Sequence, residues 1–158
     1  MVRLAELSEP ERKGMLGRVK ELSAFTGKGA WIIPPPLSQC RIAIITTAGL
    51  HHHGDVPFTE GPAQADYRVI SGEATAADLT MSHNSINFDR TGFQQDINVV
   101  FPIDRLRELA TDKTIGSVAG FHYSFMGALP PKALEPRGRA LAGLLKQDKV
   151  DAVILTPV

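Results

Sequence analysis

The stretch RIAIITTAG, residues 41–49, decides the fold of this chain. It is short, rich in β-branched residues and almost continuously apolar, which is typical of a parallel strand buried on both faces. A second stretch of the same kind, VDAVILTPV, occupies residues 150–158. Strands this apolar are buried by helices on both sides of a sheet. The two stretches therefore predict an α/β fold.

The rest of the sequence supplies the elements that would surround these two strands. Apolar residues recur at helical spacing in three segments, and two further short apolar runs are typical of strands. We predict helices over 3–22, 103–112 and 137–147, and short strands over 67–71 and 78–82. The start signal Ser8-Glu9-Pro10-Glu11 offers Ser8 as an alternative beginning of the first helix. The predicted architecture is three-layered, with a mostly parallel sheet and flanking helices, and it is flavodoxin- or Rossmann-like.

Two parts of different character follow one another along the chain. Residues 1–36 contain the N-terminal helix and a connector over 23–37, in which three consecutive prolines at 34–36 forbid a helix. Residues 37–158 hold the strands and the remaining helices. We therefore predict a short N-terminal part followed by one α/β domain.

The composition excludes several classes of function. Lys and Arg together number 17, as do Asp and Glu, so the chain offers no electrostatic footprint for nucleic acid or an anionic membrane. No apolar run approaches the roughly 20 residues of a membrane span, and the N-terminus lacks the apolar core of a signal peptide. The single cysteine, Cys40, fits a reducing compartment. We expect a cytoplasmic protein.

Four segments carry a resemblance to a known family: 41–49, DLTMSH at 78–83, DINVVFPIDRLREL at 96–109, and 150–158. They resemble the selenoprotein B family of the glycine, sarcosine, betaine and D-proline reductases. The similarity extends over roughly 37–158, and the third segment is its most specific part. The stretch FHYSFMG at 121–127 is similar to shorter, freestanding members.

The resemblance implies a redox residue directly after Val158. In the family, the equivalent of Thr156-Pro157-Val158 is followed at once by selenocysteine or cysteine. One interpretation is that the next codon is UGA, encodes selenocysteine and was read as a stop, so that the C-terminal part is missing. The alternatives are a deliberate truncation, a natural loss of the tail, or a small domain that simply ends on a strand.

The activity that the resemblance implies is reductive C–N bond cleavage of a small amine substrate. A carbonyl-bearing partner subunit would activate the substrate, and a thiol or selenol carrier would receive the carbon fragment, with a disulfide as acceptor. The chain itself would hold no cofactor, the full-length protein would contain selenium as selenocysteine, and the 158 residues alone would be inactive. An exposed sheet edge makes a homodimer plausible.

Seven residues are candidates for this site. His83 and His122 are the predicted catalytic pair, because one imidazole could protonate the leaving group while the other orients the substrate. Each could instead only cap a loop through a hydrogen bond. Substrate-binding candidates are Thr46, Thr47, Gly49, Tyr123 and Arg105. The structural alternatives are a strand terminator for the first three and a solvated helix face for Arg105.

Two other functions remain open. His51, His53, Asp55 and His83 could form a zinc-like set in a lyase or hydrolase, with His122 as a further ligand. No ligand spacing matches a known metal motif, so we predict no metal site and a solvated loop. The third possibility is a non-catalytic interaction module.

Overall fold

The computed structural model describes residues 3–21, 32–58, 62–85, 90–127 and 129–158. The chain divides into two compact units, Met1–Ile32 and Ile33–Val158, and each is described by itself. The predicted boundary after residue 36 remains a prediction, and most of the predicted connector lies outside the described residues. None of the described helices is both long and apolar enough to cross a bilayer.

The first unit contains a short 3-10 helix, η1 (Leu4–Glu6), and the helix α1 (Glu9–Glu21). Ser8 precedes α1, and both its backbone N–H and its hydroxyl donate to the Glu11 carboxylate. This local cap explains why the helix starts at residue 9, in agreement with the start signal at Ser8 and later than residue 3, where the predicted helical stretch begins.

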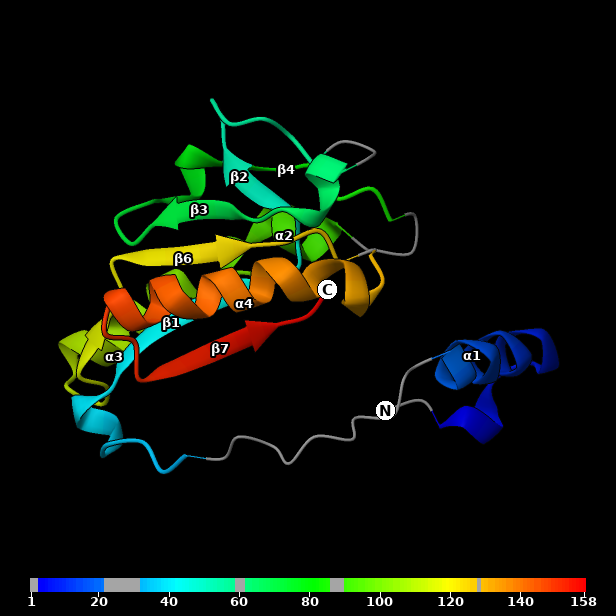
Figure 1. The fold of residues 1–158 in the computed structure, drawn as a ribbon, viewed down its shortest axis with the longest axis horizontal. Helices are drawn as coiled ribbons and strands as arrows, with labels where there is room; N and C mark the ends of the chain where they lie inside the picture. The colour runs from blue at the N-terminus through cyan, green and yellow to red at the C-terminus, as the bar shows by residue number, and fades with distance from the viewer. Residues whose placement is uncertain (1–2, 22–31, 59–61, 86–89, 128) are drawn as a thin grey trace. The chain divides into compact units, whose positions relative to one another are not determined.

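The second unit is built around β1 (Arg41–Thr46), the strand that the opening stretch predicts (Figure 1). β7 (Ala152–Thr156) runs parallel to β1 along one edge, from Ile42↔Ala152 to Thr46↔Thr156. The other edge of β1 is shared by β5 (Ser117–Val118) and then β6 (Phe121–Ser124), both parallel to it. β3 (Arg68–Ser71) pairs antiparallel with β6 and extends the sheet.

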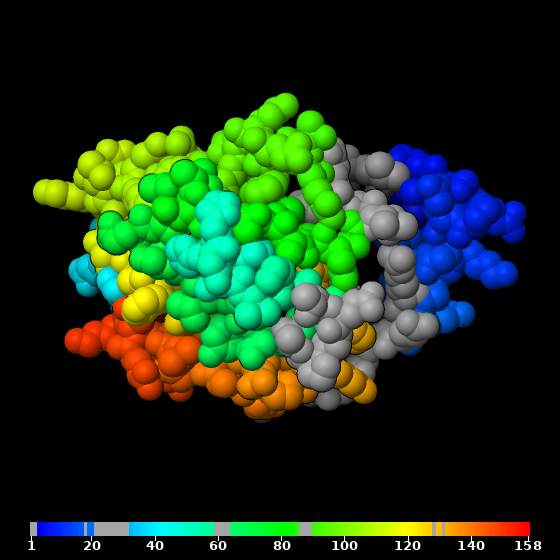
Figure 2. Space-filling model, turned by 90° about the horizontal axis from the view of Figure 1, so that it is seen from above, coloured from blue at the N-terminus to red at the C-terminus, as the bar shows by residue number. Residues whose placement is uncertain are grey.

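A small second sheet covers part of this unit. β2 (Leu50–His52) pairs antiparallel with β4 (Leu79–Met81), and in Figure 2 this region lies at the centre of the face, coloured cyan to green. The predicted strand over 78–82 contains β4, whereas β2 lies where the sequence predicts a solvated loop, because three consecutive histidines obscure the short strand.

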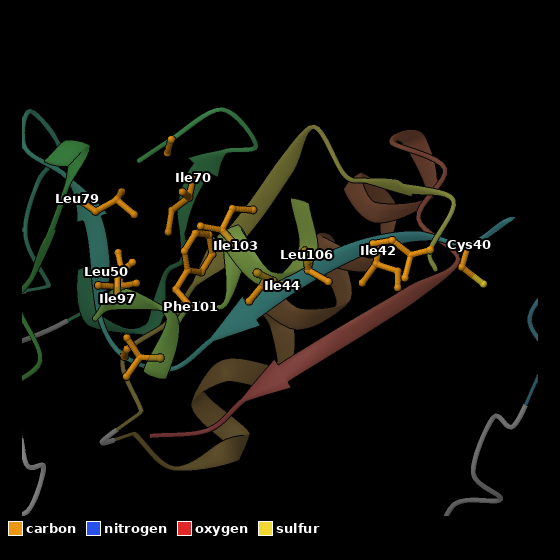
Figure 3. Close-up of a cluster of buried hydrophobic side chains, with 14 residues drawn as sticks. Cys40, Ile42, Ile44, Leu50, Ile70, Leu79, Ile97, Phe101, Ile103 and Leu106 are labelled. Atoms are coloured by element: carbon orange, nitrogen blue, oxygen red, sulfur yellow. The ribbon is translucent and has the colours of Figure 1, made fainter. Parts of the chain in front are cut away.

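Helices cover both faces of the main sheet. α3 (Ile103–Thr111) contributes Ile103 and Leu106 to a core with the inward residues of β1, which Figure 3 shows. α4 (Pro131–Gln147) contributes Leu141 to a second cluster on the opposite face. The remaining short helical segments are η2 (Leu37–Gln39), η3 (Pro62–Ala65), η4 (Ala76–Asp78), α2 (Thr91–Gln95) and η5 (Ile97–Val99).

The α/β prediction is confirmed, and the three pairings of β1 are parallel as expected. The main sheet is nevertheless mixed, because β3 is antiparallel, and β2 and β4 form a separate antiparallel pair. The structure therefore supports a mixed α/β fold, and the finer flavodoxin- or Rossmann-like assignment stays unconfirmed.

Candidate functional site

The candidate site lies at the carboxyl end of β1, where the segments that follow β4, β6 and β7 meet. Gly49 connects two of these segments to the end of β1. Its N–H donates to Phe125 O at 2.9 Å, and its carbonyl accepts from Ser82 N–H at 3.0 Å. Its φ of +68° is in the left-handed region, and a Cβ there would stand 3.1 Å from the backbone nitrogen of His83. Glycine therefore allows the three segments to approach one another closely.

Thr46, a predicted substrate-binding residue, is fully buried. Its Oγ1 accepts the Ala48 N–H at 3.2 Å and lies 3.4 Å from Thr156 O. These contacts stabilise the end of β1 and its connection to β2. They are the contacts expected if Thr46 only terminates the strand.

Thr47 contacts the end of the chain segment that leaves β7. Its Oγ1 accepts the Val158 N–H at 2.8 Å and lies 3.4 Å from Val158 O, while its own carbonyl accepts the Gly127 N–H at 2.9 Å. The ends of β1, β6 and β7 are thus joined at one point (Figure 1).

His83 lies beside this point and is 4% exposed. Its Nδ1 accepts the Ser85 N–H at 3.1 Å, so in the neutral imidazole the proton is on Nε2. The Arg90 guanidinium donates to the His83 carbonyl. Burial, and then the nearby Arg90 charge, lower the pKa of His83 below its usual 6.5, which favours the neutral imidazole.

His122 lies in the sheet, away from the meeting point. On this edge of β1, the Ile42 carbonyl accepts from Ala119 N–H and the Thr46 carbonyl accepts from Phe125 N–H. Between them, the Ile44 N–H donates to His122 Nδ1 at 2.9 Å, so the imidazole replaces a backbone acceptor where β5 gives way to β6. His83 and His122 thus bond to different parts of the backbone, His83 to Ser85 and His122 to Ile44, and their joint catalytic role stays a prediction.

The burial of His122 is complete, and it lowers the pKa of this imidazole to about 4. Its ring packs nearly perpendicular to Phe101, with 5.5 Å between the ring centroids. Within the described part of the chain, Nε2 has no hydrogen-bond partner. These features fit a neutral imidazole that completes a β-ladder.

The last two predicted substrate-binding residues occupy other surroundings. Tyr123 is 3% exposed and packs edge-on against Tyr67, with 5.6 Å between the ring centroids, and burial raises its pKa. Arg105 projects from α3 and forms an exposed ion pair with Glu108 at 2.8 Å. Tyr123 lies opposite Ile45 of β1 in the sheet, whereas Arg105 is on the surface of α3.

The proposed metal ligands do not converge. His51 is buried, with Nδ1 2.8 Å from His52 O, whereas His53 is exposed, with Nε2 2.9 Å from Ala77 O. Asp55 accepts the His52 N–H at 3.3 Å. Among the residues that the structure describes, no three His, Cys, Asp or Glu side chains are placed to hold a metal ion.

Sequence reasoning missed two residues of this region. Ser124 is fully buried, and its Oγ accepts the Leu50 N–H at 2.8 Å, which ties β6 to β2. Gly127 packs directly against Val158. No sequence signal marks either one, because both roles depend on the alignment of strands that are distant in the chain.

An apolar pocket of about 250 Å³ lies between β1 and α4. Thr47 is part of its lining, together with Ile45 and Phe125 from the sheet side. From α4 come Leu134, Gly138, Leu141, Ala142 and Leu145. The hydroxyl that holds Val158 is therefore on a residue that also faces a pocket.

Comparisons with known proteins point to one family. The sequence model of the glycine/sarcosine/betaine reductase selenoprotein B family matches residues 33–158. The D-proline reductase subunit gamma of Acetoanaerobium sticklandii is 36% identical over 135 residues, which are 79% of this chain and 54% of that protein. The glycine reductase complex component B subunit gamma of Carboxydothermus hydrogenoformans is 30% identical over 123 residues, 76% of this chain and 28% of that protein.

The sarcosine reductase complex component B subunit beta of Peptoclostridium acidaminophilum is also 30% identical, over 125 residues, 76% of this chain and 28% of that protein. The chain thus matches about half of the D-proline reductase subunit and less than a third of the other two. No solved structure matches the chain.

Proposed function

Because this chain belongs to the glycine/sarcosine/betaine reductase selenoprotein B family, we propose that it is a component of a selenol- or thiol-dependent reductase. The proposed reaction is reductive C–N bond cleavage of a small amine substrate, in which a thiol or selenol pair supplies the two electrons and is left as a disulfide or selenenyl sulfide. The proposed nucleophile is a selenocysteine or cysteine directly after Val158, and without it the 158 residues are inactive.

One observation carries the proposal: the family match spans the whole second unit, including both strands that end at the candidate site. The three relatives described above are all subunits of reductases. The physical arrangement supports the same location, since chemistry in open α/β sheets gathers outside the carboxyl ends of the strands. A rigid strand end also holds a reactive group more precisely than a free loop.

His83 has a specific role in this proposal. A neutral imidazole with its proton on Nε2 donates a hydrogen bond but is a poor proton source at pH 7. The lowered pKa of His83 therefore favours a hydrogen-bond donor to the substrate or to the reactive chalcogen. Thr47 and Gly49 shape the same end of β1, while His122 keeps a structural role in the sheet.

The proposed partners are other reductase subunits, since two of the relatives are named as subunits of a reductase complex component. They comprise a carbonyl-bearing subunit that activates the substrate and a thiol or selenol carrier that receives the product. We place the assembly in the cytoplasm, where the single, buried Cys40 stays reduced.

A second copy of the chain is a further proposed partner. In the described residues β7 pairs with β1 alone, so its outer edge is unpaired, and Leu155 on this strand is 68% exposed. β7 carries none of the lysine or proline residues that usually protect an edge. Light scattering should give twice the chain mass for the wild type and the single chain mass for Leu155→Lys.

The test of the proposed activity is a reconstituted assay. The coding sequence is extended through the codon after Val158, expressed with cysteine or selenocysteine there, and combined with the partner subunits of a reductase complex. We expect C–N cleavage, seen as ammonia or an alkylamine released from glycine, sarcosine or betaine, or as a ring-opened amino acid formed from D-proline. The cleavage should be lost when the added residue is serine, and equal cleavage by the serine form would overturn the proposal.

A further inference from the structure

The β1–β7 ladder ends before the point where the chain leaves β7. The last paired residues are Thr46 and Thr156, and the final backbone bond runs from Thr47 N–H to Thr156 O at 3.1 Å. Pro157 has no N–H to donate. Backbone pairing alone would therefore leave Val158 unanchored.

Beyond the end of the ladder, the Thr47 side chain binds the backbone of Val158. Its hydroxyl accepts the Val158 N–H at 2.8 Å and lies 3.4 Å from the Val158 carbonyl oxygen, to which it can donate. One hydroxyl thus contacts both polar groups of the same residue and sets its orientation. Threonine suits this task because its β-branched side chain has few χ1 rotamers.

Gly127 packs against both Thr47 and Val158. Its N–H donates to the Thr47 carbonyl at 2.9 Å, which brings its Cα against Val158. A Cβ at this position would stand 2.6 Å from the Val158 carbonyl oxygen and 2.9 Å from Thr47 Oγ1. Both distances are too short for a side chain, so any larger residue must displace Val158 or the Thr47 hydroxyl.

We infer that Thr47 and Gly127 are positioning residues that fix the direction in which the chain leaves β7, and so set where the residue after Val158 emerges. The inference rests on the proposed function, in which that residue is the nucleophile. Thr47 also lines the apolar pocket of about 250 Å³ beside α4. The pair acts through Val158 and does not itself contact substrate in this proposal.

Amide hydrogen exchange at Val158, followed by NMR in the 158-residue chain, tests the contact directly. We expect the wild type and Thr47→Ser to protect this amide. Thr47→Val, which keeps the shape but removes the acceptor, should speed its exchange about tenfold, the equivalent of one hydrogen bond. Gly127→Ala should have the same effect by displacement.

The matched control is Thr111→Val on α3, where the Thr111 hydroxyl donates to Arg107 O. It removes one threonine hydroxyl elsewhere and should leave Val158 exchange unchanged. If Thr47→Val does not fold, Gly127→Ala carries the test, and a Val158 amide as well protected in this variant as in the wild type overturns the inference. An unprotected Val158 amide in the folded wild type overturns the inference.

A second readout separates this inference from the proposed function. In the protein extended with cysteine after Val158, the pH profile of thiol alkylation should be shared by the wild type and Thr47→Ser and shifted in Thr47→Val. Identical profiles for all three overturn the positioning role. A protected Val158 amide in a protein without reductase activity leaves the contact intact and removes only the proposed function.

Discussion

At the scale of single residues, His122 shows how a polar side chain can look catalytic and yet complete the fold. Its Nδ1 occupies the position of a backbone acceptor for Ile44 N–H, in the middle of the central strand. Protonation would remove this acceptor and place a charge in the core. Burial therefore lowers the pKa of His122 to about 4.

This pKa makes stability depend on pH. The unfolded chain binds a proton at His122 near pH 6.5, whereas the folded chain does so only near pH 4. The free energy of unfolding should therefore fall as the pH falls from about 6.5 to about 4, by about 3 kcal/mol for this group. The lowered pKa of His83 acts in the same direction. Urea unfolding over this pH range measures the slope.

Substitution assigns that slope to His122. His122→Leu should remove most of the pH dependence and destabilise the protein at pH 7 by about 1–3 kcal/mol, because the Ile44 N–H then lies buried without an acceptor. His53→Asn, on an exposed histidine, controls for the loss of an imidazole. An unchanged slope in the Leu variant would show that His122 is not the group responsible.

The contacts of individual residues are also what the sequence could not predict. Thr46, Thr47, Gly49 and His83 were selected because they stand at predicted strand ends, and their role in a substrate site stays a prediction. The individual contacts could not be predicted, because the Thr47–Val158 hydrogen bond depends on the β1–β7 register. Gly127 was missed for the same reason.

At the scale of elements, one carboxylate joins the beginning of the sheet to the end of α4. Asp148 accepts from the Arg41 Nε at 3.1 Å and from the N–H groups of Gly120 and Phe121 at 2.9 and 3.3 Å. Burial acts to raise the pKa of Asp148, but the hydrogen bonds and charge of Arg41 hold it below its usual value. The Asp148 carboxylate thus connects β1, the end of α4 and the start of β6.

Asp148→Ala should therefore lower the free energy of unfolding by about 2 kcal/mol, since it leaves a partly buried guanidinium and two N–H groups without their acceptor. Glu135→Ala on the same helix is the matched control. It breaks only the exposed pair with Arg139 and should cost less than about 1 kcal/mol. Equal losses for the two variants in urea unfolding would contradict the role of Asp148.

Helices and strands were predicted correctly where the pattern of apolar residues is continuous, and they were missed or shortened where that pattern is short or interrupted. β1, β7 and α3 follow from unbroken apolar runs and a helical stripe. α4 begins at Pro131, earlier than the predicted residue 137, because Pro136 lies inside the helix and conceals its first turns. β5 and β6 are too short to stand out, and their strand character comes from pairing with β1.

At the scale of the whole molecule, the second unit has a core of its own. Every buried hydrophobic residue among those described lies between Cys40 and Leu141. Residues 33–158 should therefore fold without residues 1–32, with a melting temperature within about 4 °C of the full chain, which corresponds to less than about 1 kcal/mol. Circular dichroism melting of both forms tests this, and a molten or unfolded 33–158 fragment would refute it.

The second unit is also the part that the family match covers, so the fold and the proposed chemistry belong to the same stretch of chain. In the proposed function, a nucleophilic selenium or sulfur atom belongs to the residue directly after Val158, where the chain leaves β7. Intact-mass and peptide mass spectrometry of the protein purified from its natural source tests this claim most directly. We predict a peptide in which Val158 is followed at once by selenocysteine or cysteine, and a peptide with any other residue there, or with Val158 as its natural end, would contradict it.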